Sequence, residues 1–164
     1  MIEKLFTNIP YVGNFFSQIG AVTGQTQNCI DMLKQEEAVI VFPEGVRGTG
    51  KGFVKRYQLQ RFGNGFMDIA IETNTPIIPV GIVGCEEALP MFGNAEGLAQ
   101  KFGLPYFPIT VPFPIPTRIT LNFGEPLYFS GPIHSEDDLE AKVNVVKAKI
   151  RQLIAEAQHK HGVK

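Results

Sequence analysis

The hydrophobic pattern along the chain predicts short buried strands that alternate with helices. Ala38–Phe42 is a continuous apolar, β-branched run closed by Pro43, which is typical of a buried strand. A helix-like stretch over about Asn28–Lys34 precedes it. Further along, helical spacing relates five positions: Phe62, Phe66, Ile69, Ala70 and Thr73. Because Pro76 cannot continue a helix, this second helix is expected to end near Asn74.

Two later segments are predicted to be strands. Ile77–Gly84 is apolar throughout, and Pro79 limits it to an edge strand or to a strand broken at that residue. Arg118–Gly124 alternates, with Ile119, Leu121 and Phe123 on one face, as in a half-buried strand. Strand, helix and strand in that order favour a βαβ unit. We therefore predict an α/β fold, with a largely parallel sheet flanked by helices.

The chain is predicted to end in a long amphipathic helix. Ser135 and Asp138 have the spacing of a capping box at its start. Its apolar face comprises Leu139, Val143, Val146, Ile150, Leu153 and Ala157. We expect this face to pack on the sheet, and a membrane-surface role for the basic side is the alternative.

One apolar segment admits two interpretations. Phe102–Pro116 contains five prolines and therefore cannot form a helix. It is either an extended loop over the core, or an apolar wall for a lipid chain or a membrane interface, because exposed apolar surface in a folded protein usually has a function.

Composition narrows the class of protein. With 164 residues, 44% hydrophobic and 19% charged, the chain has the profile of one globular domain over residues 1–164. No apolar run reaches the roughly 18 to 20 residues that cross a bilayer, and the N-terminus shows no secretory signal pattern. Cys29 and Cys85 stand alone, so we expect neither a disulfide framework nor a metal site, and a reducing compartment.

The net charge is -1, but positive charges are concentrated in two regions of the chain. Gly45–Gly65, here called the basic loop, carries five positive charges and no acidic residue: Arg47, Lys51, Lys55, Arg56 and Arg61. Its glycines leave backbone amides accessible, which favours an anion-binding role. Lys142–Lys164 has six basic residues against Glu156, and we interpret that excess as a solvated helix face.

The start of the basic loop matches part of a nucleotide-binding P-loop. Gly45–Lys51 fits the first seven positions of that motif and follows a predicted strand. The eighth position, however, is Gly52 rather than the Ser or Thr that holds magnesium, and Glu44 would oppose a triphosphate. We therefore treat the match as coincidental.

A better match starts earlier in the same residues. Phe42–Arg47 (FPEGVR) resembles the FPEGTR block of the glycerophospholipid acyltransferase family, with Val46 in place of Thr. About thirty residues on, Pro76–Val80 (PIIPV) resembles that family's next block, a strand with paired prolines. Arg56–Gly63 and Phe123–Leu127 are also similar to bacterial members, so the resemblance covers about residues 9–129.

The resemblance implies transfer of a fatty acyl group from acyl-CoA or acyl carrier protein to the hydroxyl of a glycerol phosphate or lysophospholipid. Glu44, Gly45 and Arg47 would then bind the acceptor phosphate, with Lys51 adding charge. The structural residues of the two blocks would be Phe42, Pro43, Pro76 and Pro79. A purely structural role for Glu44, paired with Arg47 or another base of the loop, is the alternative.

The chain departs from the family at the catalytic pair. The family uses a His followed five positions later by an Asp, upstream of the FPEG block, where the His accepts the hydroxyl proton. The first His of this sequence is His134, and its spacing to Asp138 is wrong. His159 and His161 lie in a tail that we expect to fray. The family's Arg after the stretch matching Ile19–Val22 is also absent.

We therefore expect one acyltransferase-like domain that lacks its N-terminal part and is inactive as this chain. The expected partners are the acceptor, the acyl thioester donor and a membrane surface, with no nucleic acid and no cofactor or metal. The expected location is cytoplasmic, peripheral to the inner face of the membrane. A remnant that binds phosphate or lipid without chemistry is the first alternative, and a P-loop nucleotide-binding protein is the second.

Overall fold

The computed structural model describes residues 25–45, 48, 51–101 and 107–161. Along these residues lie α3 (Thr26–Lys34), the 3-10 helix η1 (Phe53–Lys55), α5 (Gly65–Glu72), β1 (Val80–Val83) and α6 (Cys85–Ala88). They are followed by β2 (Met91–Asn94), α7 (Glu96–Lys101), β3 (Pro108–Thr110), β4 (Thr120–Phe123) and α8 (Glu136–His161). The described residues contain no helix both long and apolar enough to cross a membrane.

Strand pairing in the described residues is antiparallel, which differs from the predicted parallel sheet. β1 pairs with β4, so that Val80 lies opposite Phe123 and Val83 opposite Thr120. β2 pairs with β3 in a second, separate two-stranded sheet. The fold is therefore a mixture of helices and small antiparallel sheets, in which the described residues include no parallel pair.

The segment predicted to be the first parallel strand remains unpaired in the described part of the chain. Ala38–Phe42 has no strand assignment, and Ile40 and Phe42 are 75% and 65% exposed. A β-branched run favours an extended backbone, but a strand also requires a hydrogen-bonded neighbour. In this structure the partner of β1 is β4, which follows it by about forty residues.

Pro79 interrupts the second strand block, as the sequence predicted. Ile77 forms an isolated bridge with Leu127, and the regular strand begins only after Pro79. Pro79 is fully buried, and its carbonyl oxygen accepts a hydrogen bond of 2.9 Å from the Gly124 amide. The strand is thus interrupted at Pro79, because proline has no N–H for the ladder.

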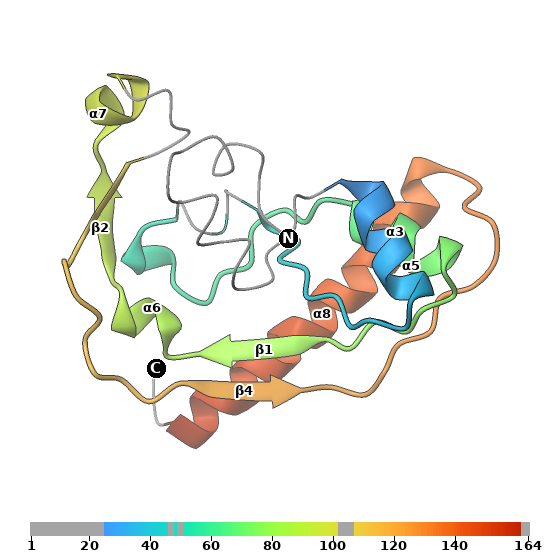
Figure 1. The fold of residues 1–164 in the computed structure, drawn as a ribbon. Coiled ribbons are helices and arrows are strands. Elements are labelled where there is room, and N and C mark those ends of the chain that lie inside the picture. Colours follow the sequence, from blue (N-terminus) through green and yellow to red (C-terminus); the bar gives the residue numbers. More distant parts are fainter. Residues whose placement is uncertain (1–24, 46–47, 49–50, 102–106, 162–164) are drawn as a thin grey trace.

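The predicted helices are all present. α3 and α5 match the two expected early helices to within a few residues, and Asn74 follows α5 with a positive φ of 51°. Contrary to the expected fraying, α8 is helical to His161. Figure 1 shows α8 crossing the β1–β4 pair and reaching α5.

The core forms three neighbouring clusters along α8 and α5. At one end of α8, Leu139, Val143 and Val146 pack with Phe62 and Met67. At the other end, Ile154 and Ala157 pack on Val83 of β1. A third cluster joins α3 to α5 through Cys29, Ile30 and Ile69. The predicted apolar face of α8 therefore packs on the sheet at its C-terminal end, as expected, whereas at its N-terminal end it packs on Phe62 and α5.

The orientation of β4 differs from the sequence expectation. Ile119, Leu121 and Phe123 are 48%, 51% and 69% exposed, so the apolar face is directed away from α8. The alternate residue Asn122 is turned toward the helix, and its side-chain amide donates a 3.1 Å hydrogen bond to the Leu153 carbonyl. Alternation was predicted correctly, but the face that packs on α8 was not.

Candidate functional site

The FPEG turn closes the base of the basic loop. Gly45 has a positive φ of 56°, and its amide donates to the Phe42 carbonyl at 3.1 Å. The Pro43 carbonyl accepts a 2.8 Å hydrogen bond from the Gly63 amide. This hydrogen bond joins the start of the basic loop to a residue near its end.

Glu44 bonds to the backbone of this loop. Its Oε1 accepts a 2.6 Å hydrogen bond from the Gln60 amide, and the side chain is partly buried. A Cβ built at Gly48 would collide with the Glu44 carboxylate, so glycine is needed there for the turn to fold against Glu44. Glu44 therefore has a structural task in the loop, and its predicted contact with a phosphate remains a prediction.

The remaining predicted phosphate ligands are only partly placed. Arg47 lies outside the described residues, as do Ile19–Val22. Lys51 is described, and its side chain is 11% exposed. Its ammonium lies 2.8 Å from Glu86 Oε1 and donates to the Gln58 carbonyl at 3.2 Å. Lys51 is thus held by protein groups rather than extended into solvent.

The structural residues of the two motif blocks have different environments. Phe42 is largely exposed, Pro43 is half-buried and Pro76 is exposed, whereas Pro79 is fully buried. Pro79 also contacts the turn after β4, because a Cβ at Gly124 would approach the Pro79 ring to 2.9 Å. The second block therefore joins the end of β4 to the start of β1.

Three residues that the sequence analysis did not single out form a contact between the basic loop and α6. Glu86 and Glu87 belong to α6, which directly follows β1, and Tyr57 follows η1. The Tyr57 amide donates to Glu86 Oε2 at 2.6 Å, and the Tyr57 hydroxyl donates to Glu87 Oε2. The sequence did contain a signal for this contact: two adjacent acidic residues follow a predicted strand, and the basic loop has no acidic residue of its own to pair with its charges.

Burial governs the chemistry of Tyr57 in this network. It raises the pKa of the Tyr57 phenol far above the ordinary value, and the hydrogen bond to Glu87 raises it further. The hydroxyl therefore keeps its proton at physiological pH. It donates that proton to Glu87 and accepts a 3.1 Å hydrogen bond from the Gly84 amide.

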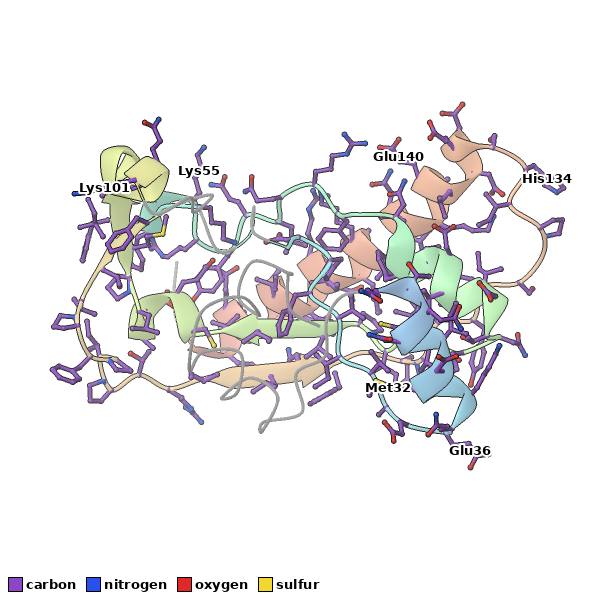
Figure 2. The ribbon with its side chains drawn as sticks, turned by 45° about the horizontal axis from the view of Figure 1, so that its top comes forward. Met32, Glu36, Lys55, Lys101, His134 and Glu140 are labelled. Carbon is purple, nitrogen blue, oxygen red and sulfur yellow. The ribbon has the colours of Figure 1, made fainter. Side chains whose placement is uncertain are left out.

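His134 lies away from this region. The backbone amide of His134 donates to Asp138 at 3.4 Å, in the turn that leads into α8. Figure 2 shows His134 at the opposite end of the molecule from Lys55 of the basic loop. His159 is exposed on α8. Among the described residues, no three His, Cys, Asp or Glu side chains are grouped to hold a metal ion.

Comparison with solved structures identifies the same fold in a longer protein. The 1-acyl-sn-glycerophosphate acyltransferase PlsC from Thermotoga maritima matches with a TM-score of 0.61 at 22% sequence identity. The match covers 96% of this chain and 55% of that chain. At this identity the likeness concerns the fold.

Curated relatives are also longer than this chain. An uncharacterised protein of Mycobacterium leprae is 38% identical over 138 residues, which is 78% of this chain and 38% of that protein. One of Mycobacterium tuberculosis is 41% identical over 130 residues, covering 73% of this chain and 36% of that protein. The human DGAT1/2-independent enzyme synthesizing storage lipids is 27% identical over 133 residues, with 79% and 40% coverage. The chain thus spans about two fifths of these relatives.

A family model settles the classification. The model described as Acyltransferase matches residues 1–83, a span that includes both the FPEG turn and the strand block with paired prolines. This match confirms the family resemblance drawn from those two blocks. The chain therefore belongs to the Acyltransferase family.

Proposed function

We propose that this chain carries the acceptor-phosphate half-site of a lipid acyltransferase. The reaction would move a fatty acyl group from acyl-CoA or acyl carrier protein to the hydroxyl of a glycerol phosphate or lysophospholipid, in phospholipid biosynthesis. The observation that carries the proposal is the FPEG turn: Glu44 and Pro43 close a loop that holds five basic residues and no acid. PlsC, which shares the fold, is a 1-acyl-sn-glycerophosphate (LPA) acyltransferase.

The chemistry of the loop suits a phosphate monoester. Such a group carries up to two negative charges and several acceptor oxygens, which arginine and lysine bind by charge-assisted hydrogen bonds. We assign the phosphate contact to Gly45, Arg47 and Lys51, with Glu44 shaping the turn and facing the glycerol moiety. No cofactor enters this proposal, since the acyl thioester is itself a substrate.

Ester formation also needs a base that takes the proton from the attacking hydroxyl. The histidines of this sequence are His134, His159 and His161, and His134 and His159 lie on or before α8. We therefore propose that the 164-residue chain binds acceptor without turnover. This leaves a phosphate- or lipid-binding role without chemistry as the second candidate function.

A membrane surface is the proposed location of the lipid substrates, on the cytoplasmic side and without insertion. Phe92, Ile109 and Phe113 are 67%, 50% and 79% exposed around the β2–β3 hairpin. Exposed apolar side chains of this size are suited to contact with lipid. This supports the second interpretation of the proline-rich segment, of which residues 102–106 lie outside the described residues.

Nucleotide binding is disfavoured by two observations. A P-loop opens directly into a helix, whereas Lys51 is followed by the three-residue 3-10 helix η1. In addition, the residue after Lys51 is Gly52, which lacks the Ser or Thr hydroxyl that holds magnesium in a P-loop.

The test is calorimetric titration of the chain with glycerol 3-phosphate and 1-acyl lysophosphatidic acid, using glycerol and magnesium ATP as negative ligands. We expect binding of the two phosphate esters only. R47A should weaken it by about tenfold or more, because a charge-assisted hydrogen bond contributes about 1.5 to 3 kcal/mol.

The matched control is R151A, which removes an exposed arginine of α8 and should leave binding unchanged. Equal binding of glycerol and glycerol 3-phosphate would refute the phosphate site. Genuine acyl transfer by this chain, with acyl-CoA or acyl carrier protein as donor, would refute the account of the missing base.

A further inference from the structure

The segment Lys51–Gln58 of the basic loop is fastened to α6 by two neighbouring carboxylates. Glu86 and Glu87 are the second and third residues of α6, immediately after the turn that ends β1. Figure 1 shows η1 beside α6, at the end of the molecule that also carries the β2–β3 hairpin. We name this set of contacts the carboxylate clamp; it comprises Lys51, Arg56, Tyr57, Glu86 and Glu87.

Glu86 uses both carboxylate oxygens on the loop. Oε1 lies 2.8 Å from the Lys51 ammonium, and Oε2 accepts from the Tyr57 amide at 2.6 Å. The Tyr57 backbone has a positive φ of 62°, a conformation that is uncommon for a non-glycine residue. A charge-assisted hydrogen bond to that amide is the contact that stabilises this conformation.

Glu87 holds the same segment through side chains. The Tyr57 hydroxyl donates to its Oε2, and its Oε1 lies 3.6 Å from Arg56 Nε. The Arg56 guanidinium in turn covers the Phe53 ring, 4.8 Å from the ring centroid. These contacts are partly buried, so they are screened less than ion pairs on an open surface.

The clamp leaves Lys51 able to bind a ligand. A lysine ammonium has three N–H donors. One is directed to Glu86 and one to the Gln58 carbonyl, so a third can bind a ligand oxygen. Because the side chain is only 11% exposed, its position is already fixed before any ligand arrives.

We propose that Glu86 and Glu87 are positioning residues for the acceptor phosphate, with Glu86 acting through Lys51 and Glu87 through Tyr57. This inference rests on the proposed function. Its physical basis is preorganisation: a loop that is ordered beforehand loses less conformational entropy when it binds a phosphate. Neither carboxylate contacts the ligand itself, since both oxygens of Glu86 are occupied by the loop, and Glu87 Oε2 is bonded to Tyr57 while its Oε1 is buried.

The first experiment measures glycerol 3-phosphate affinity and amide hydrogen exchange for the wild type and E86Q. Glutamine can still accept from the Tyr57 amide but loses the charge that holds Lys51. We expect about a tenfold loss of affinity, by the magnitude of one charge-assisted hydrogen bond. Exchange over residues 51–58 should accelerate while the urea unfolding midpoint stays the same.

A double-mutant cycle separates positioning from a purely structural role. If Glu86 acts through Lys51, K51M lowers affinity, and E86Q added to K51M lowers it little further. E87Q tests the other half of the clamp and should accelerate exchange at Tyr57 with a smaller loss of affinity. The matched control is E140Q, which changes an exposed carboxylate of α8 that lies well away from Lys55 in Figure 2.

The possible results distinguish failure of this inference from failure of the proposed function. Faster exchange with unchanged affinity in E86Q would reduce the clamp to a structural feature and overturn the inference, while the proposed function stands. Tighter binding by E86Q would show that Glu86 competes with the ligand for Lys51 and would also overturn it. Absence of glycerol 3-phosphate binding by the wild type would refute the proposed function, and the inference with it.

Discussion

At the residue scale, neighbouring charges and burial determine the chemistry of Cys85. The thiol is free and lies directly before the two carboxylates of the clamp. Partial burial raises its pKa above the ordinary value, and the negative charges of Glu86 and Glu87 raise it further. Since the thiolate is the reactive species, an exposed cysteine at this position is a weak nucleophile at neutral pH.

This pKa shift predicts the pH profile of thiol alkylation. The rate of iodoacetamide modification at Cys85 should rise with pH later than that of a cysteine in an unstructured peptide. E87Q should move the midpoint toward lower pH, because it removes one of the two charges. Mass spectrometry of the labelled peptide measures the rate, with the buried Cys29 as an internal unreactive thiol. An identical profile in E87Q and wild type would contradict the electrostatic explanation.

At the element scale, the sequence correctly predicted the start of α8, because the interactions that stabilise it form between residues close together in the chain. Ser135 caps α8 as its spacing indicated: the Asp138 amide donates to Ser135 Oγ at 3.2 Å. Lys142, one turn later, pairs with Asp138, and this hydrogen bond holds the pKa of the carboxyl below its usual range. Both interactions lie within eight residues, so they required no knowledge of the fold.

Removing the cap should destabilise the protein measurably. S135A leaves the Asp138 amide without its side-chain acceptor, and such caps contribute about 1 kcal/mol. We expect that loss of unfolding free energy in urea titrations followed by circular dichroism. S130A, which changes an exposed serine in the preceding loop, is the matched control. Equal stability of S135A and S130A would show that the cap contributes nothing.

At the scale of the whole molecule, stability depends on how closely α8 approaches β1. Gly81 faces the helix, and a Cβ built there would lie 2.8 Å from the Ile154 nitrogen and from Leu153 Cβ. The Ile154 nitrogen and the Leu153 carbonyl carbon, which would lie 2.9 Å away, belong to the helix backbone, which cannot rotate away as a side chain could. The absence of a side chain at Gly81 thus determines the distance between the two layers.

G81A should therefore separate α8 from the sheet. Overpacking of this kind destabilises a core by about 1 to 3 kcal/mol, and the clusters around Val83 and Ile154 would lose contact first. Urea unfolding measures the loss, and hydrogen exchange in α8 locates it. G97A, on α7 where a Cβ meets nothing within 4 Å, should be neutral or slightly stabilising. An unchanged unfolding free energy in G81A would mean that α8 can move away from β1 without cost and would contradict this explanation.

The sequence by itself determined the features that depend on near neighbours in the chain. The helices around Asn28–Lys34 and after Phe62, the capped helix that begins near Ser135, and the interruption at Pro79 follow from periodicity and from the chemistry of Ser and Pro. The family also followed, because the FPEG turn and the paired prolines are contiguous motifs.

Tertiary structure decided which segments meet. The pairing of β1 with β4, the face of β4 that packs on α8, and the contact of Lys51 with Glu86 join residues from about thirty to forty positions apart. The alternation of apolar and polar residues defines the two faces of a strand, but it does not show which face a helix covers. Likewise, a cluster of basic residues in the sequence does not show which carboxylates will pair with them. Such choices depend on the free energy of the whole packing arrangement, and so they appeared only in the folded chain.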